Sequence, residues 1–134
     1  MYCLDASVII SAAKPDEFYF EKSKAFLNQI REKEIKVFLP EIIIPEIASG
    51  LLRATKNPKI SYRLALSLRT VPNFSFVPVD SKLANLASWV VCQIKLKGTD
   101  AIYVALAYDY NLELITLDKE QLERSKKLIK VTRP

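Results

Sequence analysis

The sequence predicts an α/β fold, a three-layer α/β/α sandwich around a central, mostly parallel sheet of four to five strands. Short apolar runs alternate with longer segments of helical periodicity along the 134 residues. Parallel strands need long crossover connections, usually helices, so this alternation favours a parallel sheet covered on both faces. Half of the residues are hydrophobic and only two are glycine, which favours regular elements over long loops. The length is that of one domain, spanning residues 1–134.

The predicted strands are short apolar or alternating runs with clear ends. The first run stops at Asp5, the second is ended by Pro40, and the fourth ends at Asp118. Proline ends a strand because it cannot donate to the ladder. The five predicted strands are residues 1–4, 35–40, 74–79, 112–118 and 126–132.

The predicted helices rest on apolar residues spaced three or four apart and on helix-start signals. Pro45 lies in a first helical turn, where proline is tolerated. Asp80 is expected to N-cap one helix, and Thr99 with Asp100 to cap the next. Trp89 is expected in the core. The predicted helices are residues 17–33, 45–54, 59–70, 81–97 and 100–110, with a short helix before the last strand.

The composition excludes several classes of site. There is no histidine, which removes His-based triads and His-ligated zinc, and two cysteines cannot make a four-thiolate zinc site. Cys3 and Cys92 lie in apolar runs and are expected to be small buried hydrophobic residues, so an intracellular, cytoplasmic protein is the default. No apolar stretch reaches the roughly 20 residues of a membrane span. The net charge of +5 is compatible with a polyanionic partner.

Four acidic residues are predicted to converge. Asp5 and Asp118 each follow a strand, while Asp100 and Glu46 lie near helix starts. In parallel sheets, these positions meet at the carboxyl edge, where ligands bind. Clustered carboxylates repel one another, and Mg²⁺ or Mn²⁺ would relieve that repulsion. Simpler roles remain open for each acid: a helix start for Asp100, a turn for Asp118, and Glu41 as a rival to Glu46.

Four segments together resemble a known family. In order, "LDASVII", "PEIASGLLRA", "TDAIYVALA" and "LITLD" are similar to motifs of the PIN-domain nucleases, particularly the small VapC-type toxins. The resemblance implies a PIN-like fold and Mg²⁺- or Mn²⁺-dependent cleavage of RNA. It implies metal-binding acids and two accessory hydroxyls at these positions: Asp5, Glu46, Asp100, Asp118, Ser7 and Thr116.

The resemblance also implies partners. They are an RNA substrate, a small antitoxin protein and a second copy of the chain in a homodimer, as in a type II toxin–antitoxin pair. A PIN-domain RNA-processing nuclease without an antitoxin is the nearest alternative. A non-catalytic RNA-binding module and a phospho-acceptor signalling domain, with Lys119 beside Asp118, are alternatives from other classes. A phosphatase using Asp5 as nucleophile lacks the second aspartate expected two residues later.

Two further surfaces are candidates for contacts with partners. Basic side chains that could hold an RNA backbone are Arg53, Lys56, Lys59, Arg63 and Arg69. Arg53 follows Glu46 by seven residues and is expected on the same helix face. The three aromatic residues 18–20 cannot all be buried by one helix, so at least one ring is expected to be exposed.

Overall fold

A computed structural model describes residues 1–134 and contains a five-stranded parallel sheet. The strand order is β3-β2-β1-β4-β5, and every neighbouring pair is parallel. This confirms the predicted sheet, although every strand is shorter than expected, the last two most of all. The strands are β1 (Tyr2–Leu4), β2 (Val37–Pro40), β3 (Phe74–Val77), β4 (Glu113–Ile115) and β5 (Val131–Thr132).

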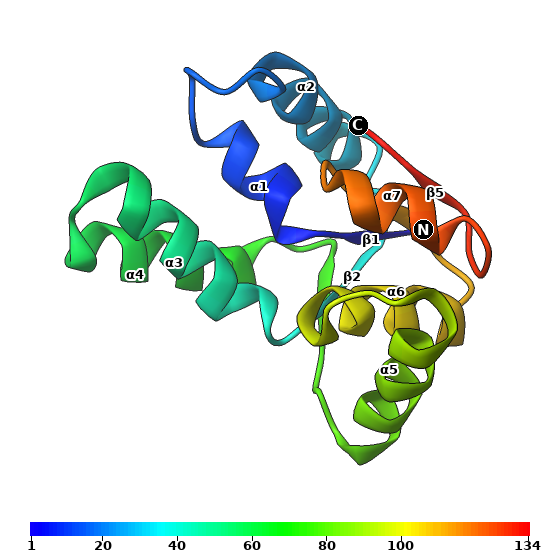
Figure 1. Ribbon diagram of the computed structural model, residues 1–134. Coiled ribbons are helices and arrows are strands. Elements are labelled where there is room, and N and C mark those ends of the chain that lie inside the picture. The colour runs from blue at the N-terminus through cyan, green and yellow to red at the C-terminus, as the bar shows by residue number, and fades with distance from the viewer.

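Helices cover both faces of the sheet and complete the predicted α/β/α sandwich. In Figure 1, α1, α2 and α7 lie on one side of the sheet and α5 and α6 on the other, while α3 and α4 extend to the left. None of the helices combines the length and apolar character needed to cross a membrane. They are α1 (Ala6–Ala12), α2 (Phe20–Glu32), α3 (Ile43–Thr55), α4 (Pro58–Ser67), α5 (Ser81–Ile94), α6 (Gly98–Asp109) and α7 (Lys119–Ser125), with a 3₁₀ turn at Leu68–Thr70.

The strand order reverses between β1 and β4. From β1 the chain moves outward through β2 and β3, and it then returns to the other side of β1 to form β4 and β5. Leu4 and Ile115 are register partners, so the carboxyl ends of β1 and β4 lie side by side. The connections that follow β1 and β4 run in opposite directions from this edge. The crevice between them is the favoured ligand-binding position in an open parallel sheet.

The hydrophobic core extends over both faces of the sheet, and α6 contributes six of its 28 buried residues. Residues Tyr103 to Ala107 are all buried in α6, as are Cys3 and Leu4 of the central strand. Cys3 is thus buried as predicted, whereas Cys92 is exposed. Strands buried on both faces are expected to be continuously apolar, which explains the runs seen in the sequence. α6 therefore packs closely on the sheet and places its first turn at the carboxyl edge.

The helix α1 was not predicted. Its sequence, "ASVIISA", is rich in Ser and β-branched residues, which are weak helix formers. The helix is stabilised by the N-cap at Asp5 and by tertiary packing, since Val8 and Ile9 are buried. The next helix, α2, starts only at Phe20, and Phe18 just before it is 87% exposed, as expected for the aromatic run.

Two other predictions about helices were wrong. α6 begins at Gly98 with Lys97 as its N-cap residue, so neither Thr99 nor Asp100 caps it. Trp89 is 39% exposed and packs against Tyr108 at the surface, with ring centroids 5.5 Å apart. It lies beside, and not on, the buried stripe of α5, which consists of Leu83, Ala87, Val90 and Ile94. By contrast, Asp80 does cap α5, as predicted, by accepting the Leu83 N–H at 2.9 Å.

Gly50 lets α3 approach α1 closely. A Cβ atom at Gly50 would lie 2.4 Å from Cδ1 and 2.9 Å from Cγ1 of Ile10. We therefore expect Gly50→Ala to lower the free energy of unfolding by about 1–3 kcal/mol, because overpacking outweighs the gain in helix propensity. Urea denaturation measures this. Gly98→Ala is the matched control, since a Cβ there meets nothing within 4 Å. Equal stabilities for the two variants would contradict the close approach.

Candidate acidic site at the carboxyl edge

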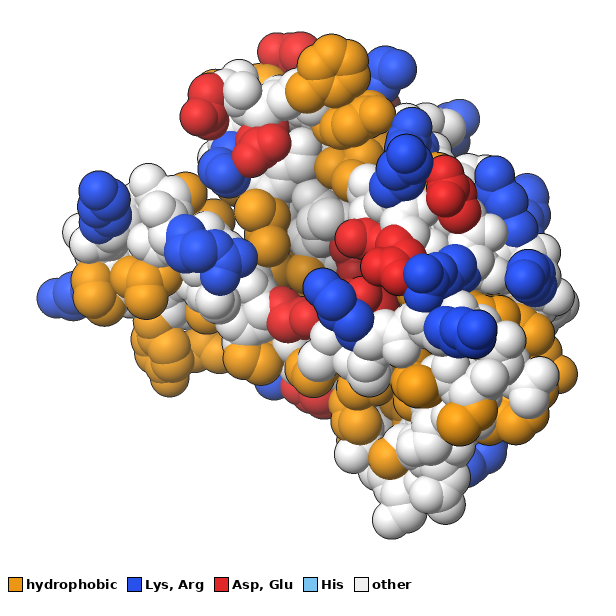
Figure 2. All heavy atoms as spheres, in the orientation of Figure 1, with side chains coloured by type: hydrophobic (Ala, Val, Ile, Leu, Met, Phe, Trp, Pro, Cys, Tyr) orange, Lys and Arg blue, Asp and Glu red, His pale blue; other side chains and the backbone are white.

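All four predicted acids line one cleft at the carboxyl edge of the sheet. The cleft has a volume of about 600 Å³. Figure 2 shows a group of acidic side chains in the middle of this face, beside a hollow, with lysine and arginine side chains around it. The polar lining residues are Asp5, Ser7, Glu46, Ser49, Arg53, Asp100 and Asp118. Residues more than a hundred positions apart in sequence are thereby brought together, as predicted.

Asp5 is the most buried of the four acids. It follows the central strand β1, is 7% exposed, and accepts the Ser7 N–H at 2.9 Å as the N-cap of α1. Burial raises the pKa of Asp5, and the charge of Asp118 adds to that rise, whereas hydrogen bonds from Ser7 and from the Gln121 side chain oppose it. A buried carboxylate beside a second one is costly unless a cation offsets the charge.

Asp118 is held by the turn between β4 and α7. It is the N-cap of α7 and accepts the Gln121 N–H at 2.6 Å, while its own N–H donates to Thr116 Oγ1 at 3.0 Å. Ser7 Oγ accepts the Leu117 N–H at 3.1 Å and so joins the start of α1 to this turn. Both predicted hydroxyls therefore shape the site, but Thr116 is fully buried behind the cleft and does not line it.

Asp100 lies in the first turn of α6, on the opposite side of the sheet from Asp118. Burial raises the pKa of Asp100 to about 6, and the charges of Asp118 and Asp5 add to the rise, while Lys97 lowers it. The charges of the other two aspartates therefore act on Asp100 in the direction expected from the sequence, although burial makes the larger contribution to its raised pKa.

The structure separates the two rival glutamates. Glu41 forms a bidentate ion pair with Arg69, at 3.0 and 2.6 Å, which lowers the pKa of Glu41. Glu46, in the first turn of α3, lines the cleft and accepts a hydrogen bond from the Tyr103 hydroxyl. Burial raises the pKa of Glu46, the Tyr103 hydrogen bond lowers it, and Asp5 and Asp100 raise it further. Glu46 therefore belongs to the acidic group and Glu41 does not.

Two residues that contact the acids were not predicted from the sequence. Tyr103 orients Glu46 across the space between α6 and α3, and Gln121 contacts the turn of Asp118 and the start of α6. Tyr103 is the one residue with a polar tip in the apolar run 101–107, which is a weak signal that its hydroxyl has a partner. Nothing in the sequence around Gln121 marks it.

The comparison with protein families matches the PIN domain over residues 2–127. The chain belongs to the PIN domain family. This confirms the resemblance seen in the four sequence motifs. A comparison with curated proteins found no match.

Solved structures share this PIN fold over nearly the whole chain. VapC20 of Mycobacterium tuberculosis, described as a sarcin-ricin loop cleaving toxin, has a TM-score of 0.81 at 16% identity, with 100% of both chains covered. A chain of FitAcB from Neisseria gonorrhoeae has a TM-score of 0.73 at 23% identity, with 98% of this chain and 96% of that chain covered. For VapBC2 of Rickettsia felis, bound to a DNA fragment from its promoter, the TM-score is 0.72 at 12% identity, with 99% and 98% covered.

The donor set of the PIN domain cleft fits a hard divalent cation. Every charged ligand on offer is a carboxylate, which suits Mg²⁺ or Mn²⁺. No three of the acidic side chains lie close enough together to form a metal-binding group. Mg²⁺ usually keeps several waters and is held by one or two carboxylates together with substrate phosphates, so two of the cleft carboxylates would be sufficient for it.

Among the predicted basic contacts, only Arg53 lines the cleft of this PIN domain. It donates to Ser49 Oγ at 2.7 Å and pairs with no carboxylate. Arg69 is held by Glu41, and Lys56, Lys59 and Arg63 are exposed outside the cleft. Lys119 does not line the cleft either, so the phospho-acceptor alternative lacks its expected cation at the acids.

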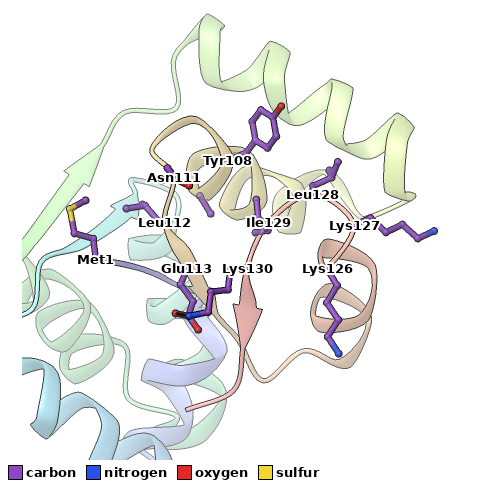
Figure 3. Close-up of a pocket in the computed structure, with 11 residues that line it drawn as sticks. Met1, Tyr108, Asn111, Leu112, Glu113, Lys126, Lys127, Leu128, Ile129 and Lys130 are labelled. Carbon is purple, nitrogen blue, oxygen red and sulfur yellow. Dashed lines mark ion pairs between the residues drawn. The ribbon is translucent and has the colours of Figure 1, made fainter.

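A second depression, of about 570 Å³, lies at the opposite edge of the sheet, before β4 and β5. In Figure 3, Lys130 reaches Glu113, with which it forms an ion pair of 2.7 Å, while Lys126 and Lys127 point away from the centre. The groups that line this depression do not converge on a common point. Of these two depressions, the one at the carboxyl edge is therefore the candidate functional site.

Proposed function

We propose that this PIN domain is a Mg²⁺- or Mn²⁺-dependent endoribonuclease that hydrolyses RNA phosphodiester bonds, and that it is the toxin of a type II toxin–antitoxin pair. One observation carries the proposal: four acids from distant segments line a single cleft at the point where the strand order reverses. Membership of the PIN domain family and the likeness to a VapC toxin support it.

Asp5 and Asp100 are the proposed main metal ligands, with Glu46 and Asp118 completing the group directly or through water. When bound, a divalent cation polarises a phosphate oxygen and lowers the pKa of water. Ser7 holds Asp5, and Tyr103 holds Glu46, so that their carboxylates face the cleft. The raised pKa values of Asp5, Glu46 and Asp100 support this assignment, because burial and mutual repulsion both disfavour the charged carboxylates and a bound cation would offset both costs.

Arg53 is the proposed phosphate contact. Its guanidinium lines the cleft without a carboxylate partner, and a guanidinium matches the geometry of a phosphate. The chain carries 20 basic and 15 acidic residues, and four of those acids lie in the cleft, so the rest of the molecule is more strongly basic than the total suggests. A basic surround attracts the negatively charged RNA backbone toward the cleft.

The proposed protein partners are a small antitoxin and a second copy of the chain. Several solved structures with this fold are toxin–antitoxin complexes, which supports the antitoxin. Co-expression with the product of a small neighbouring gene, followed by co-purification, tests the antitoxin. Light scattering of the purified chain tests the homodimer.

The activity is tested by incubating purified protein with a structured RNA in Mg²⁺, in Mn²⁺ and in EDTA. We expect cleavage in either metal, none in EDTA, and products with 5′-phosphate and 3′-hydroxyl ends. Cleavage that persists in EDTA contradicts metal dependence. Binding of RNA without cleavage, in folded and metal-loaded protein, would favour the non-catalytic alternative.

The two glutamates give a matched pair of variants. We expect Glu46→Gln to lower the cleavage rate about tenfold to a hundredfold, because a ligand to the metal or its water loses its charge. Glu41→Gln breaks only an exposed ion pair with Arg69 and is expected to leave the rate unchanged. Single-turnover cleavage rates under equal metal concentration make the comparison. Equal losses in the two variants would argue against the assignment of Glu46.

A further inference from the structure

Gln121 is fully buried under the acidic cleft, although glutamine is usually exposed. It lies in the first turn of α7, and its backbone N–H donates to Asp118 Oδ1 at 2.6 Å. Its side-chain Nε2 donates to the main-chain carbonyl of Asp100 at 3.1 Å. In Figure 1, α7 and α6 lie on opposite sides of the sheet, so one residue joins the two segments that carry Asp118 and Asp100.

The same side chain also reaches the third aspartate. The Gln121 amide lies near Asp5, where it favours the charged carboxylate and so lowers the pKa of Asp5. Its Oε1 atom is buried with no hydrogen-bond partner. Burying an unpaired amide oxygen is costly, and an apolar side chain of similar length would avoid that cost. The position is therefore poorly explained by core packing alone.

A neutral donor suits this position better than a cation would. A lysine or arginine under the acids would neutralise them and compete with a divalent cation for the same carboxylates. An amide can order the carboxylates while leaving their negative charge available. The contacts of Gln121 are the kind that orient metal ligands from behind.

We propose that Gln121 is a positioning residue of the acidic cleft, which fixes Asp100 and Asp118 relative to one another for binding a divalent cation. This inference rests on the proposed metal-binding role of the acids. It makes Gln121 a determinant of metal affinity without direct contact to metal or RNA.

The test compares Gln121→Met with Ser125→Ala. Methionine keeps the length of the side chain and removes its amide contacts. Ser125 lies one turn later on α7, is equally buried, and has an unpaired Oγ with no contact to the acids. Calorimetric titration with Mn²⁺ gives the Kd, and thermal unfolding of the metal-free proteins gives the Tm.

We expect Gln121→Met to weaken Mn²⁺ binding about tenfold to a hundredfold, with a metal-free Tm close to that of wild type. Ser125→Ala should match wild type in both measurements. A Gln121→Met protein that binds Mn²⁺ as tightly as wild type, whatever its Tm, overturns the inference. A wild type that binds no Mn²⁺ overturns the proposed metal site itself, so the two failures are distinguishable.

Should Gln121→Met fail to fold, the wild-type protein supplies a second test by NMR. During a Mg²⁺ titration, the side-chain amide resonances of Gln121 should shift with the same midpoint as the backbone amides of Asp100 and Asp118. The exposed Gln29 and Gln93 side chains are internal controls and should not shift. A Gln121 amide that stays unchanged while the aspartates respond overturns the inference.

Discussion

Replacing Asp5 or Asp100 by asparagine should reduce RNA cleavage by at least about a thousandfold while the protein stays folded. A metal centre supplies several kcal/mol of transition-state stabilisation, and each 1.4 kcal/mol or so corresponds to a tenfold rate. Asparagine preserves the N-cap of α1 at Asp5, because its side-chain oxygen accepts the same Ser7 N–H. The loss of activity is therefore expected without a loss of helix structure, and circular dichroism checks the latter.

Asp80→Asn is the matched control for this experiment. Asp80 also caps a helix at the carboxyl side of a strand, by accepting the Leu83 N–H, but it does not line the cleft. Its cleavage rate should equal that of wild type in a single-turnover assay. Activity that survives both Asp5→Asn and Asp100→Asn would place the reaction elsewhere. Loss of activity in Asp80→Asn would indicate a general effect of removing carboxylates.

Although Asp100→Asn should abolish cleavage, it should make the metal-free protein more stable than wild type at neutral pH. Because the folded-state pKa of Asp100 is about 6, above the 3.8 of a free aspartate side chain, the folded protein holds the proton more tightly than the unfolded chain. Stability is therefore lost as the pH rises from about 4 to about 6. Asp100→Asn removes this loss. Its Tm should match that of wild type near pH 4 and exceed it above pH 6, in EDTA.

Adding Mg²⁺ should make wild type more stable than Asp100→Asn, which reverses their order in EDTA. At neutral pH, Mg²⁺ at about a hundred times its Kd adds roughly 2.7 kcal/mol to wild-type stability by mass action. Asp100→Asn, which lacks a proposed ligand, should gain less. Differential scanning fluorimetry across pH, with and without Mg²⁺, measures both effects. A variant less stable than wild type in EDTA at pH 7.5 would contradict the raised pKa of Asp100.

The positions of the four acids could be predicted because each is defined by local sequence. Asp5 and Asp118 follow buried strands, and Glu46 and Asp100 lie in first helical turns, and all of these positions meet at the carboxyl edge of a parallel sheet. The choice between Glu41 and Glu46 could not be made locally. It depends on Arg69, which lies 28 residues from Glu41 and pairs with it only in the folded protein.

The residues that contact the acids from behind could not be predicted either, because their partners are also distant in sequence. Tyr103 is 57 residues from Glu46, and Gln121 is 21 residues from Asp100. Each of these contacts depends on how two helices are placed relative to one another in the folded protein. The helix α1 was missed because its residues have weak helix propensity and its stability comes from the Asp5 cap and from packing.

The most direct measurement of the metal site is an anomalous-diffraction map of crystals soaked in Mn²⁺. We predict a Mn²⁺ peak in the cleft, with carboxylate oxygens of Asp5 and Asp100 at about 2.1 Å from the ion, as expected for a small hard cation with oxygen ligands. The Gln121 side chain should lie behind these ligands and outside the coordination shell. Soaked crystals with no peak in the cleft, or with Mn²⁺ bound only elsewhere, would contradict the proposal that these acids form a metal-dependent catalytic centre.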